Sequence, residues 1–451
     1  MTPRIVAHAC SGDGPATAAA APIRILPASI PQNVAWTASG SVAYALCQWG
    51  TLVAFARLGT PEALGQFAFA LAISAPIMMF LQLQLRTVQV TDTEERFEFA
   101  DYLALRLIAS LLGLGAVLAV AAAAGYGGSA IAVAGLVAGV KVLDGIGDVL
   151  SGAWQKLERL DVPAGLLILN GVVSLGALTV ALWVGASVAV AVAGSLAGSI
   201  VALAASVWLS RRHLRDALRP SPGTLHRMRA LFVLALPLGF VMALISLTSN
   251  IPRYFIQLSF GERELGIFAA LIYVTAAGTT MVSAVGNSLT PGMAREFDRG
   301  NLAAFTRRVW ALVSVAAAIG AGSVLVAVLF ARPLLELAYG PAYAAAAPAF
   351  VRAMVLGTIT YMAAAVGFAM SAAKCFRAQA PLFAIVVGGV LAASAAWIPS
   401  GGLNAAVSAL MVGASLQLAL GAAVVFRAVR SARATFAPCG ASAGEGRVTP
   451  W

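Results

Sequence analysis

Long apolar runs follow one another along most of the chain, separated by short polar connections. A helix that crosses a bilayer needs about 20 apolar residues, and blocks of that size recur from residue 33 to residue 426. The blocks lie at residues 33–56, 64–84, 102–124, 128–150, 163–184, 187–209, 230–252, 265–288, 306–330, 345–371, 380–397 and 402–426. This pattern predicts an all-α polytopic membrane protein with about 12 transmembrane helices.

The longest clearly polar connection, "SRRHLRDALRPSPGTLHRMRA" (210–230), divides the blocks into two equal sets. In each set the second block is followed by a charged segment, at residues 86–102 and 294–308. Two similar halves around a central cleft are a common plan for transporters. We therefore predict a disordered N-terminal tail (1–31), a first six-helix bundle (32–209), a basic cytoplasmic linker (210–229), a second six-helix bundle (230–427) and a cytoplasmic C-terminal tail (428–451).

Composition supports a membrane protein. The chain of 451 residues is 60% hydrophobic and only 10% charged, with a mean hydropathy of +0.89, whereas soluble domains carry roughly 25% charged residues. The net charge of +11 would suggest a nucleic-acid partner in a soluble protein. Here it reflects topology, so we expect no nucleic acid as a partner and only a secondary attraction to anionic membrane lipids.

The arginines and lysines set the expected orientation. If the N-terminus is cytoplasmic, most of them fall in cytoplasmic segments, including Arg106 at the start of the third block. The outer segments then receive only Arg57, Arg253, Arg263, Arg332 and Arg352. Cytoplasmic loops of membrane proteins are enriched in lysine and arginine. The asymmetry therefore predicts a multi-pass membrane protein with both termini cytoplasmic.

Motifs for bound groups are missing from the sequence. The 4 cysteines are scattered and form no CxxC pair, and the 3 histidines lie in expected tails or loops. The chain has no Gly-rich loop ending in GK[ST], which would cradle the phosphates of a nucleotide. We expect no cofactor, no metal site and no enzymatic activity.

A charged stripe occurs inside the fourth block. On a helix, Lys141, Asp144, Asp148 and Gln155 fall within an arc of roughly 60°. A charge near the middle of a membrane is costly and usually faces a polar interior or a partner. One interpretation is a local Lys141–Asp144 ion pair with Asp148 at the membrane interface. The other is a stripe that lines a cavity, where Lys141 meets an anionic substrate or an acid carries a coupling proton.

Three arginines near the ends of other blocks are further candidates. Arg86 follows the second block and shares a helical face with two glutamines, as either an interfacial anchor or a ligand. Arg253 follows Pro252 at the expected outer end of the seventh block, where Pro252 would help to end the helix. Arg253 is either an interfacial arginine or a residue of the outward mouth of a cleft. Arg352 lies in the tenth block.

Several segments resemble a known family. The most similar is "LALPLGFVMALISLTSNIPRYFIQLSFGERELGIFAALIYV" (234–274), followed by 289–305, 147–161 and 81–92. They look like segments of bacterial polysaccharide-biosynthesis proteins of the lipid-linked oligosaccharide flippase type. These form the Wzx-like branch of the multidrug/oligosaccharidyl-lipid/polysaccharide (MOP) exporter superfamily. The resemblance covers about residues 33–430 and rests on the order and layout of the segments.

The resemblance implies two six-helix bundles around a V-shaped cleft that opens alternately to each side of the membrane. It implies transport of a polyprenyl-pyrophosphate-linked oligosaccharide to the periplasmic leaflet, in association with a polysaccharide polymerase and glycosyltransferases. A pyrophosphate headgroup would pair with guanidinium groups in such a cleft. The candidate substrate-binding residues are Arg253, Lys141, Arg86 and Arg352, and the candidate ion-coupling residues are Asp144 and Asp148.

Two other functions stay open from the sequence. An ion-coupled multidrug or toxin exporter of the same superfamily would favour acidic sites in the membrane, whereas the embedded residues here are of both signs. A membrane polysaccharide polymerase or ligase would need a long outer loop, and the outer connections here span only on the order of a dozen residues.

Overall fold

The computed structural model describes residues 30–92, 94–211 and 224–436, and every regular element in these ranges is helical, which confirms the predicted class. The α-helices are α1 (Ile30–Leu58), α2 (Pro61–Leu81), α3 (Leu85–Thr91), α4 (Phe99–Ala123), α5 (Gly128–Lys156), α6 (Asp161–Trp183), α7 (Val188–Ser210), α8 (Thr224–Tyr273), α9 (Thr275–Asp298), α10 (Leu302–Ala338), α11 (Ala347–Ala372) and α12 (Gln379–Phe436). Short 3₁₀ turns, η1 (Pro341–Ala346) and η2 (Phe376–Ala378), precede α11 and α12.

In the described residues, 9 helical stretches are long and apolar enough to cross a membrane. Thr224–Asp298 and Phe376–Arg433, with 75 and 58 residues, are far too long for one crossing of about 20 residues. Both contain a glycine with positive φ, Gly261 (81°) and Gly402 (59°), which interrupts the helix. Glycine adopts this conformation without strain. Each break falls at a boundary between two predicted blocks, and the count of twelve crossings stays a prediction.

The apolar surface of the helices faces outward as well as inward. Leu111, Trp183 and Leu258 are 64%, 76% and 78% exposed on the outside of the bundle. A soluble monomer seldom exposes a contiguous apolar surface of this kind. Lipid tails solvate such side chains, so the structure is that of a multi-pass membrane protein.

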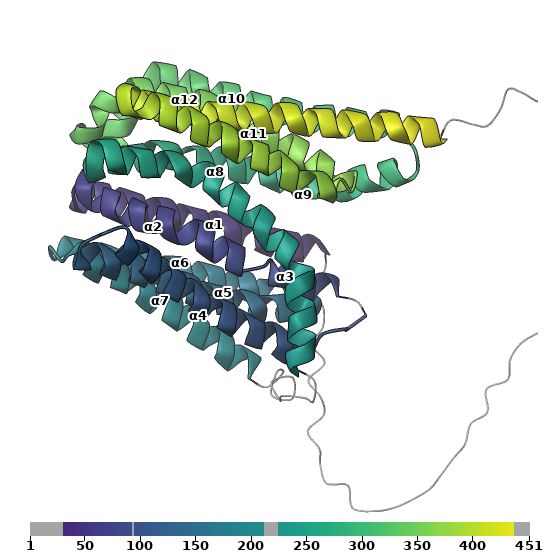
Figure 1. The fold of residues 1–451 in the computed structure, drawn as a ribbon, viewed down its shortest axis with the longest axis horizontal. Helices are drawn as coiled ribbons and strands as arrows, with labels where there is room; N and C mark the ends of the chain where they lie inside the picture. Colours follow the sequence, from purple (N-terminus) through teal and green to yellow (C-terminus); the bar gives the residue numbers. More distant parts are fainter. Residues whose placement is uncertain (1–29, 93, 212–223, 437–451) are drawn as a thin grey trace, which may run out of the picture.

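The helices form two lobes (Figure 1). The first lobe contains α1 to α7 and the second contains α9 to α12, while α8 runs diagonally from one to the other. The first turns of α8, with Met228, Leu231 and Ala235, are buried against α3 and α4. Its second half packs on α12, where a Cβ added at Gly413 would lie 3.5 Å from Thr248. Helix α8 therefore belongs to the core of both lobes.

Parts of the predicted domain plan lie outside the described residues. These are the N-terminal tail up to residue 29, most of the linker (212–223) and the end of the C-terminal tail (437–451). Helix α12 continues to Phe436, so residues 428–436 of the predicted tail are helical. The remaining domain limits stay predictions.

The end of the second block differs from the prediction. Helix α2 stops at Leu81, and the chain passes through Leu83 (φ 53°) and Gln84 (φ 51°) before α3 begins. Both residues have left-handed backbone conformations, which end a helix. Arg86 therefore lies on a separate short helix that packs against α5.

Pro252 does not end the seventh block. The helix continues through Pro252 to the break at Gly261, so the prediction that this proline helps to terminate the helix was wrong. Prolines are tolerated inside membrane helices because neighbouring groups satisfy the freed carbonyls. Arg253 consequently lies about two turns before the end of the helical segment.

The lobes contact each other at one end, which we call the closed end and which carries the α1–α2 turn and Gly261. The indole of Trp49 donates to the hydroxyl of Tyr339 at 3.0 Å, and the amide of Gln66 donates to Glu262 at 2.9 Å. The Arg57 guanidinium donates to backbone carbonyls in the last turn of α10. The negative end of the α10 helix dipole also stabilises a cation at this position.

Two glycines bring the backbones together at the closed end. A Cβ added at Gly65 of α2 would lie 1.9 Å from the carbonyl oxygen of Glu262, and one at Gly266 would lie 2.0 Å from that of Pro61. Any larger side chain would force the helices apart. Glycine is the residue that permits such close helix crossings in membranes.

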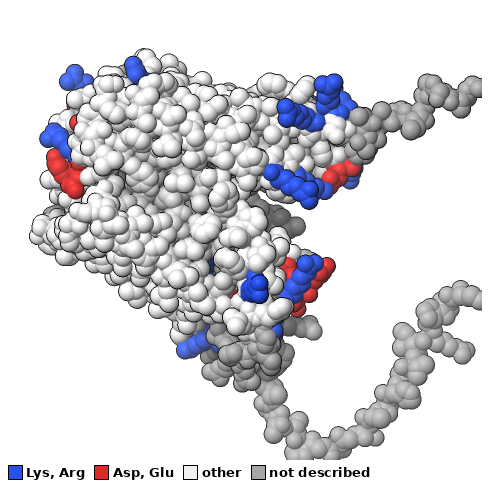
Figure 2. Space-filling view, viewed as in Figure 1, with Lys and Arg blue, Asp and Glu red and all other residues white. Residues whose placement is uncertain are grey.

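The opposite end carries the start of α1 and the end of α12, and we call it the open end (Figure 1). The space-filling view shows the lobes separated by a hollow there, with lysine and arginine clusters on both sides (Figure 2). At this end the ion pairs Lys374–Asp298 (2.8 Å) and Arg308–Glu296 (3.6 Å) lie within the second lobe.

Candidate functional site

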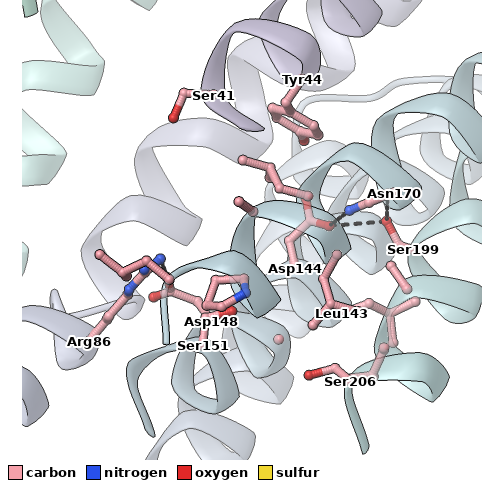
Figure 3. A pocket seen from close by; sticks show the side chains of 18 of the residues that line it. Ser41, Tyr44, Arg86, Leu143, Asp144, Asp148, Ser151, Asn170, Ser199 and Ser206 are labelled. Carbon is pink, nitrogen blue, oxygen red and sulfur yellow. Dashed lines mark hydrogen bonds and ion pairs between the residues drawn. The ribbon is translucent and has the colours of Figure 1, made fainter. Parts of the chain in front are cut away.

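A cavity of about 250 Å³, lined by both polar and apolar side chains, lies in the first lobe. Helices α1, α3, α5, α6 and α7 all contribute to its wall (Figure 3). Its polar lining residues are Thr37, Ser41, Tyr44, Arg86, Asp144, Asp148, Ser151, Asn170, Ser199 and Ser206. Two predicted ion-coupling residues and one predicted substrate-binding arginine therefore share one cavity within a lobe.

Asp144 is the centre of a hydrogen-bonded group in this cavity. Its Oδ1 accepts from Asn170 and from Ser199, both at 3.0 Å, and its Oδ2 lies 3.5 Å from Nζ of Lys141. Figure 3 shows Asp144, Asn170 and Ser199 pointing toward one another from α5, α6 and α7. The Lys141 and Asp144 side chains are 32% and 20% exposed. The carboxylate is thus compensated by a cation and two neutral donors.

Lys141 itself faces the other side of this group. It lines a smaller cavity of about 40 Å³, which Tyr44, Asn170 and Ser199 also line. The predicted local Lys141–Asp144 pair is present. Asp144 and Asp148 line the larger cavity and Lys141 lines the smaller one, and their roles in binding a substrate or a coupling ion stay predictions.

Asp148 lies one turn farther along α5 and is shared by two arginines. Its Oδ1 is 3.3 Å from Nη1 of Arg86, and its Oδ2 is 3.5 Å from Nη2 of Arg106. Nε of Arg86 also donates to Gln155 at 3.0 Å. Figure 3 shows Arg86 beside Asp148 at one side of the cavity. Arg86 therefore lines the cavity as part of a charged cluster.

A glycine on α5 makes room for α3. A Cβ added at Gly152 would lie 2.3 Å from Oε1 of Gln89 on α3. The missing side chain lets α3 bring its long polar side chains against α5. This is a consequence of packing between helices that are distant in the sequence.

Arg253 lies away from this cavity, in the second half of α8. Its Nη1 donates to Oδ1 of Asn250 at 3.0 Å, and Asn250 donates to the carbonyl of Ser246 at 2.8 Å. With Gln257, these residues form a polar row at helical spacing. Buried Nε of Arg253 and Oε1 of Gln257 have no hydrogen-bond partner in the described part of the chain.

Arg352 is exposed near the start of α11, and no ion pair or hydrogen bond of its side chain is found among the described residues. The structure does not bring Arg253, Arg352 and Arg86 together. Arg86 lies near the open end, whereas Arg253 and Arg352 lie toward the closed end. The predicted roles of all three residues stay predictions.

Arg106 was assigned to topology from the sequence, and the structure places it inside the first lobe. Helix α4 begins at Phe99, so Arg106 is about two turns inside the helix, and its side chain is 1% exposed. The one sequence signal for burial was that Arg106 falls within the third apolar block (102–124). Its proximity to Asp148, which is 42 residues away in the sequence, had no signal in the chain.

Within the described residues, no group of three or more His, Cys, Asp or Glu could hold a metal ion. Asn170 of α6 forms an inter-helix hydrogen bond to Asp144 of α5 at 3.0 Å.

Comparisons with known proteins agree with the resemblance seen in the sequence. A family model described as "Polysaccharide biosynthesis protein" matches residues 30–297, more than half of the chain. The capsular polysaccharide biosynthesis protein CapF of Staphylococcus aureus is 26% identical over 300 residues, which cover 66% of this chain and 74% of CapF.

Solved structures share the fold. The inward-facing conformation of a multidrug resistance MATE family transporter of the MOP superfamily superposes with a TM-score of 0.63 at 16% identity, covering 92% of this chain and 98% of the other. A MOP superfamily transporter from Pyrococcus furiosus, described as having a binding pocket of reverse polarity, gives 0.60 at 15% identity, covering 89% and 96%. This chain therefore belongs to the polysaccharide biosynthesis protein family and has the fold of the MOP superfamily transporters.

Proposed function

We propose that this protein is a flippase of the bacterial inner membrane. It moves a polyprenyl-pyrophosphate-linked oligosaccharide from the cytoplasmic to the periplasmic leaflet, for assembly of a cell-surface polysaccharide. The observation that carries the proposal is Arg86, a partly exposed arginine that lines a cavity of the first lobe in a chain of this family. A guanidinium binds a pyrophosphate through paired, charge-assisted hydrogen bonds, which are stronger away from bulk water.

The arrangement of the lobes supports alternating access. They contact each other around Trp49, Arg57 and Gly65 and are separated at the opposite end. The lysine and arginine residues near the open end favour a cytoplasmic location for it under the positive-inside rule. In the proposed cycle the structure is the state open to the cytoplasm, with both termini on that side, and rocking of the lobes opens the other side.

Asp144 is the proposed coupling group. Protonation or binding of a small cation at its carboxylate would weaken its pairing with Lys141 and loosen the contacts from Asn170 and Ser199. These partners come from α6 and α7, so the change would alter packing within the first lobe. Arg253 is the proposed contact for the headgroup late in the crossing, because it lies nearer the closed end.

An exporter of cationic drugs is the second candidate, favoured by the solved multidrug transporters that share the fold. Such a protein needs a carboxylate free to meet a cation. Here Asp144 and Asp148 each have a basic partner within 3.5 Å, which favours an anionic substrate. Glycosyltransferases and a polysaccharide polymerase are the proposed functional partners, acting before and after the flippase rather than within it.

Deletion of the gene tests the function. In a strain without a redundant flippase, leaflet-specific labelling should show the lipid-linked glycan trapped on the cytoplasmic side, and the wild-type gene should restore delivery. Normal periplasmic delivery in the deletion strain would refute the flippase. Increased sensitivity to cationic drugs with normal glycan delivery would support the exporter instead.

A further inference from the structure

Arg106 is the most deeply buried charged side chain of the cluster around Asp148. Its side chain is 1% exposed, and its one charged partner in the described chain is Asp148, at 3.5 Å. Its Nε and Nη1 are buried and have no hydrogen-bond partner there. Tyr102 and Leu105, its neighbours on α4, belong to a buried apolar cluster. The buried guanidinium thus has two donor atoms that are unsatisfied within the described chain.

Such an arrangement is unfavourable for stability. A buried charge loses its hydration, and a single ion pair seldom compensates for that loss. Apolar residues of similar volume would stabilise the same position better. A role in function is the better explanation for a charge in the membrane interior.

The two arginines around Asp148 are not equivalent. Arg86 is 35% exposed and has a second partner in Gln155, so water or a ligand can replace Asp148 as its partner. Arg106 is only 1% exposed and would be left as an uncompensated buried charge if Asp148 were lost. Electrostatic interactions are also stronger in its low-dielectric surroundings. Asp148 therefore stays with Arg106 when the cluster opens.

The net charge of the cluster also indicates that Arg86 can bind an anion. With both arginines present, two positive charges face one negative charge, and the cluster has a net charge of +1. The buried Arg106 neutralises the charge of Asp148, so the partly exposed charge of Arg86 can bind an anion in the cavity. Without Arg106, Asp148 would hold Arg86 in a neutral pair.

We propose that Arg106 is a positioning residue that holds Asp148 and thereby frees Arg86 to bind an anionic diphosphate headgroup in the cavity of the first lobe. This inference rests on the proposed function and deepens it, since it assigns the headgroup to one site and gives the site a charge balance. Arg106 does not touch the ligand. It acts through Asp148: while Asp148 stays paired with Arg106, the guanidinium of Arg86 is available to bind the headgroup.

The experiment measures binding of farnesyl pyrophosphate to the purified full-length protein in lipid nanodiscs by isothermal titration calorimetry. Arg86→Gln should weaken binding about tenfold to hundredfold, the effect of losing a charged hydrogen bond. Arg106→Gln should weaken it by a similar factor, because Asp148 then captures Arg86. Arg106→Lys, which keeps the buried charge, should bind within about threefold of the wild type.

The decisive variant removes both members of the buried pair. Arg106→Gln/Asp148→Asn leaves Arg86 with no anionic partner, so binding should return to within about threefold of the wild type. Removing both members of a buried pair can also restore folding, so affinity is compared only on the folded, monodisperse fraction of each variant, where a merely structural role predicts no loss of affinity in Arg106→Gln. The double variant has no uncompensated buried charge, so it keeps the test valid even if Arg106→Gln alone folds poorly. Arg96→Gln removes an exposed arginine outside the cavity and is the matched control.

Each outcome decides the inference. Rescue by the double variant supports it, whereas double-variant binding as weak as that of Arg106→Gln overturns it, as does wild-type binding by Arg106→Gln. If the wild type binds farnesyl pyrophosphate no better than farnesol, the proposed headgroup specificity fails and the inference fails with it. Binding of farnesyl pyrophosphate without rescue leaves the proposed function standing and overturns the role of Arg106 alone.

Discussion

The glycine contact between α2 and α8 gives a sharp test of alternating access. Gly65 lies where the two lobes meet, and a Cβ there would be 1.9 Å from the backbone oxygen of Glu262. Ordinary contact begins at 3.4 Å, so Gly65→Ala needs about 1.5 Å of separation, the difference between the two values. The obstacle is backbone on both sides, so no side-chain rotation can relieve it.

The size of the effect follows from this geometry. Overpacking of a close contact costs about 1–3 kcal/mol. In the proposed cycle this contact is lost when the closed end opens, so the cost changes the equilibrium between the closed and open states. We expect the population ratio to shift about 5- to 150-fold toward opening of the closed end.

Distances between spin labels measure this shift. Leu58 at the end of α1 and Leu337 near the end of α10 are exposed at the closed end, by 42% and 77%. Both would be changed to cysteine in a variant whose 4 native cysteines are replaced. Double electron–electron resonance should show a dominant short distance in the parent and a larger population of long distances in Gly65→Ala.

The control is Gly176→Ala on α6, where an added Cβ meets nothing within 4 Å. Alanine is favoured over glycine in a helix, so this variant should fold and keep the parent distance distribution. A Gly65→Ala distribution that superimposes on those of the parent and of Gly176→Ala would refute the reasoning. Size-exclusion chromatography confirms that each variant is folded and monodisperse before labelling.

Further outcomes follow from the other contacts. Arg57→Ala removes donors to the last carbonyls of α10. It should change the ratio of closed to open states, measured with the same spin labels, by less than about tenfold. An unchanged distance distribution would show that these bonds do not hold the closed end. Asp144→Asn should abolish complementation of glycan export at normal protein levels, whereas Ser199→Ala, which removes one of the contacts of that carboxylate, should keep partial export; equal export by both variants would argue against coupling at Asp144. Arg253→Ala and Lys141→Ala should each abolish complementation while immunoblots of membranes show normal insertion, and full complementation by either would remove that residue from the mechanism.

The helices could be predicted from the sequence because their signal is local. A bilayer requires about 20 apolar residues for each crossing, and the blocks in the sequence correspond to the helical segments on both sides of Gly261 and Gly402. Helix ends were harder, because packing decides them. Leu83 is fully buried in a left-handed conformation at the end of α2, which no composition rule predicts.

The charged stripe on α5 could be predicted, whereas its partners could not. Helical periodicity alone places Lys141, Asp144 and Asp148 on one face. The surroundings of this face depend on which helices pack around α5. In the structure these are α1, α6 and α7 of the same lobe. Arg253, expected near the same cleft, lies on α8 with Asn250 as its partner.

The sequence by itself determined that this chain is a helical membrane protein in two halves, with a basic side and embedded charges. Those properties depend on apolar length and on where each charge lies along the chain. Only the tertiary structure decided that Arg106 is buried against Asp148 and that Gly65 lies in a close backbone contact with Glu262 at the closed end. Both depend on helices that are far apart in the sequence and whose backbones approach closely, because a buried charge must find its partner across a helix interface.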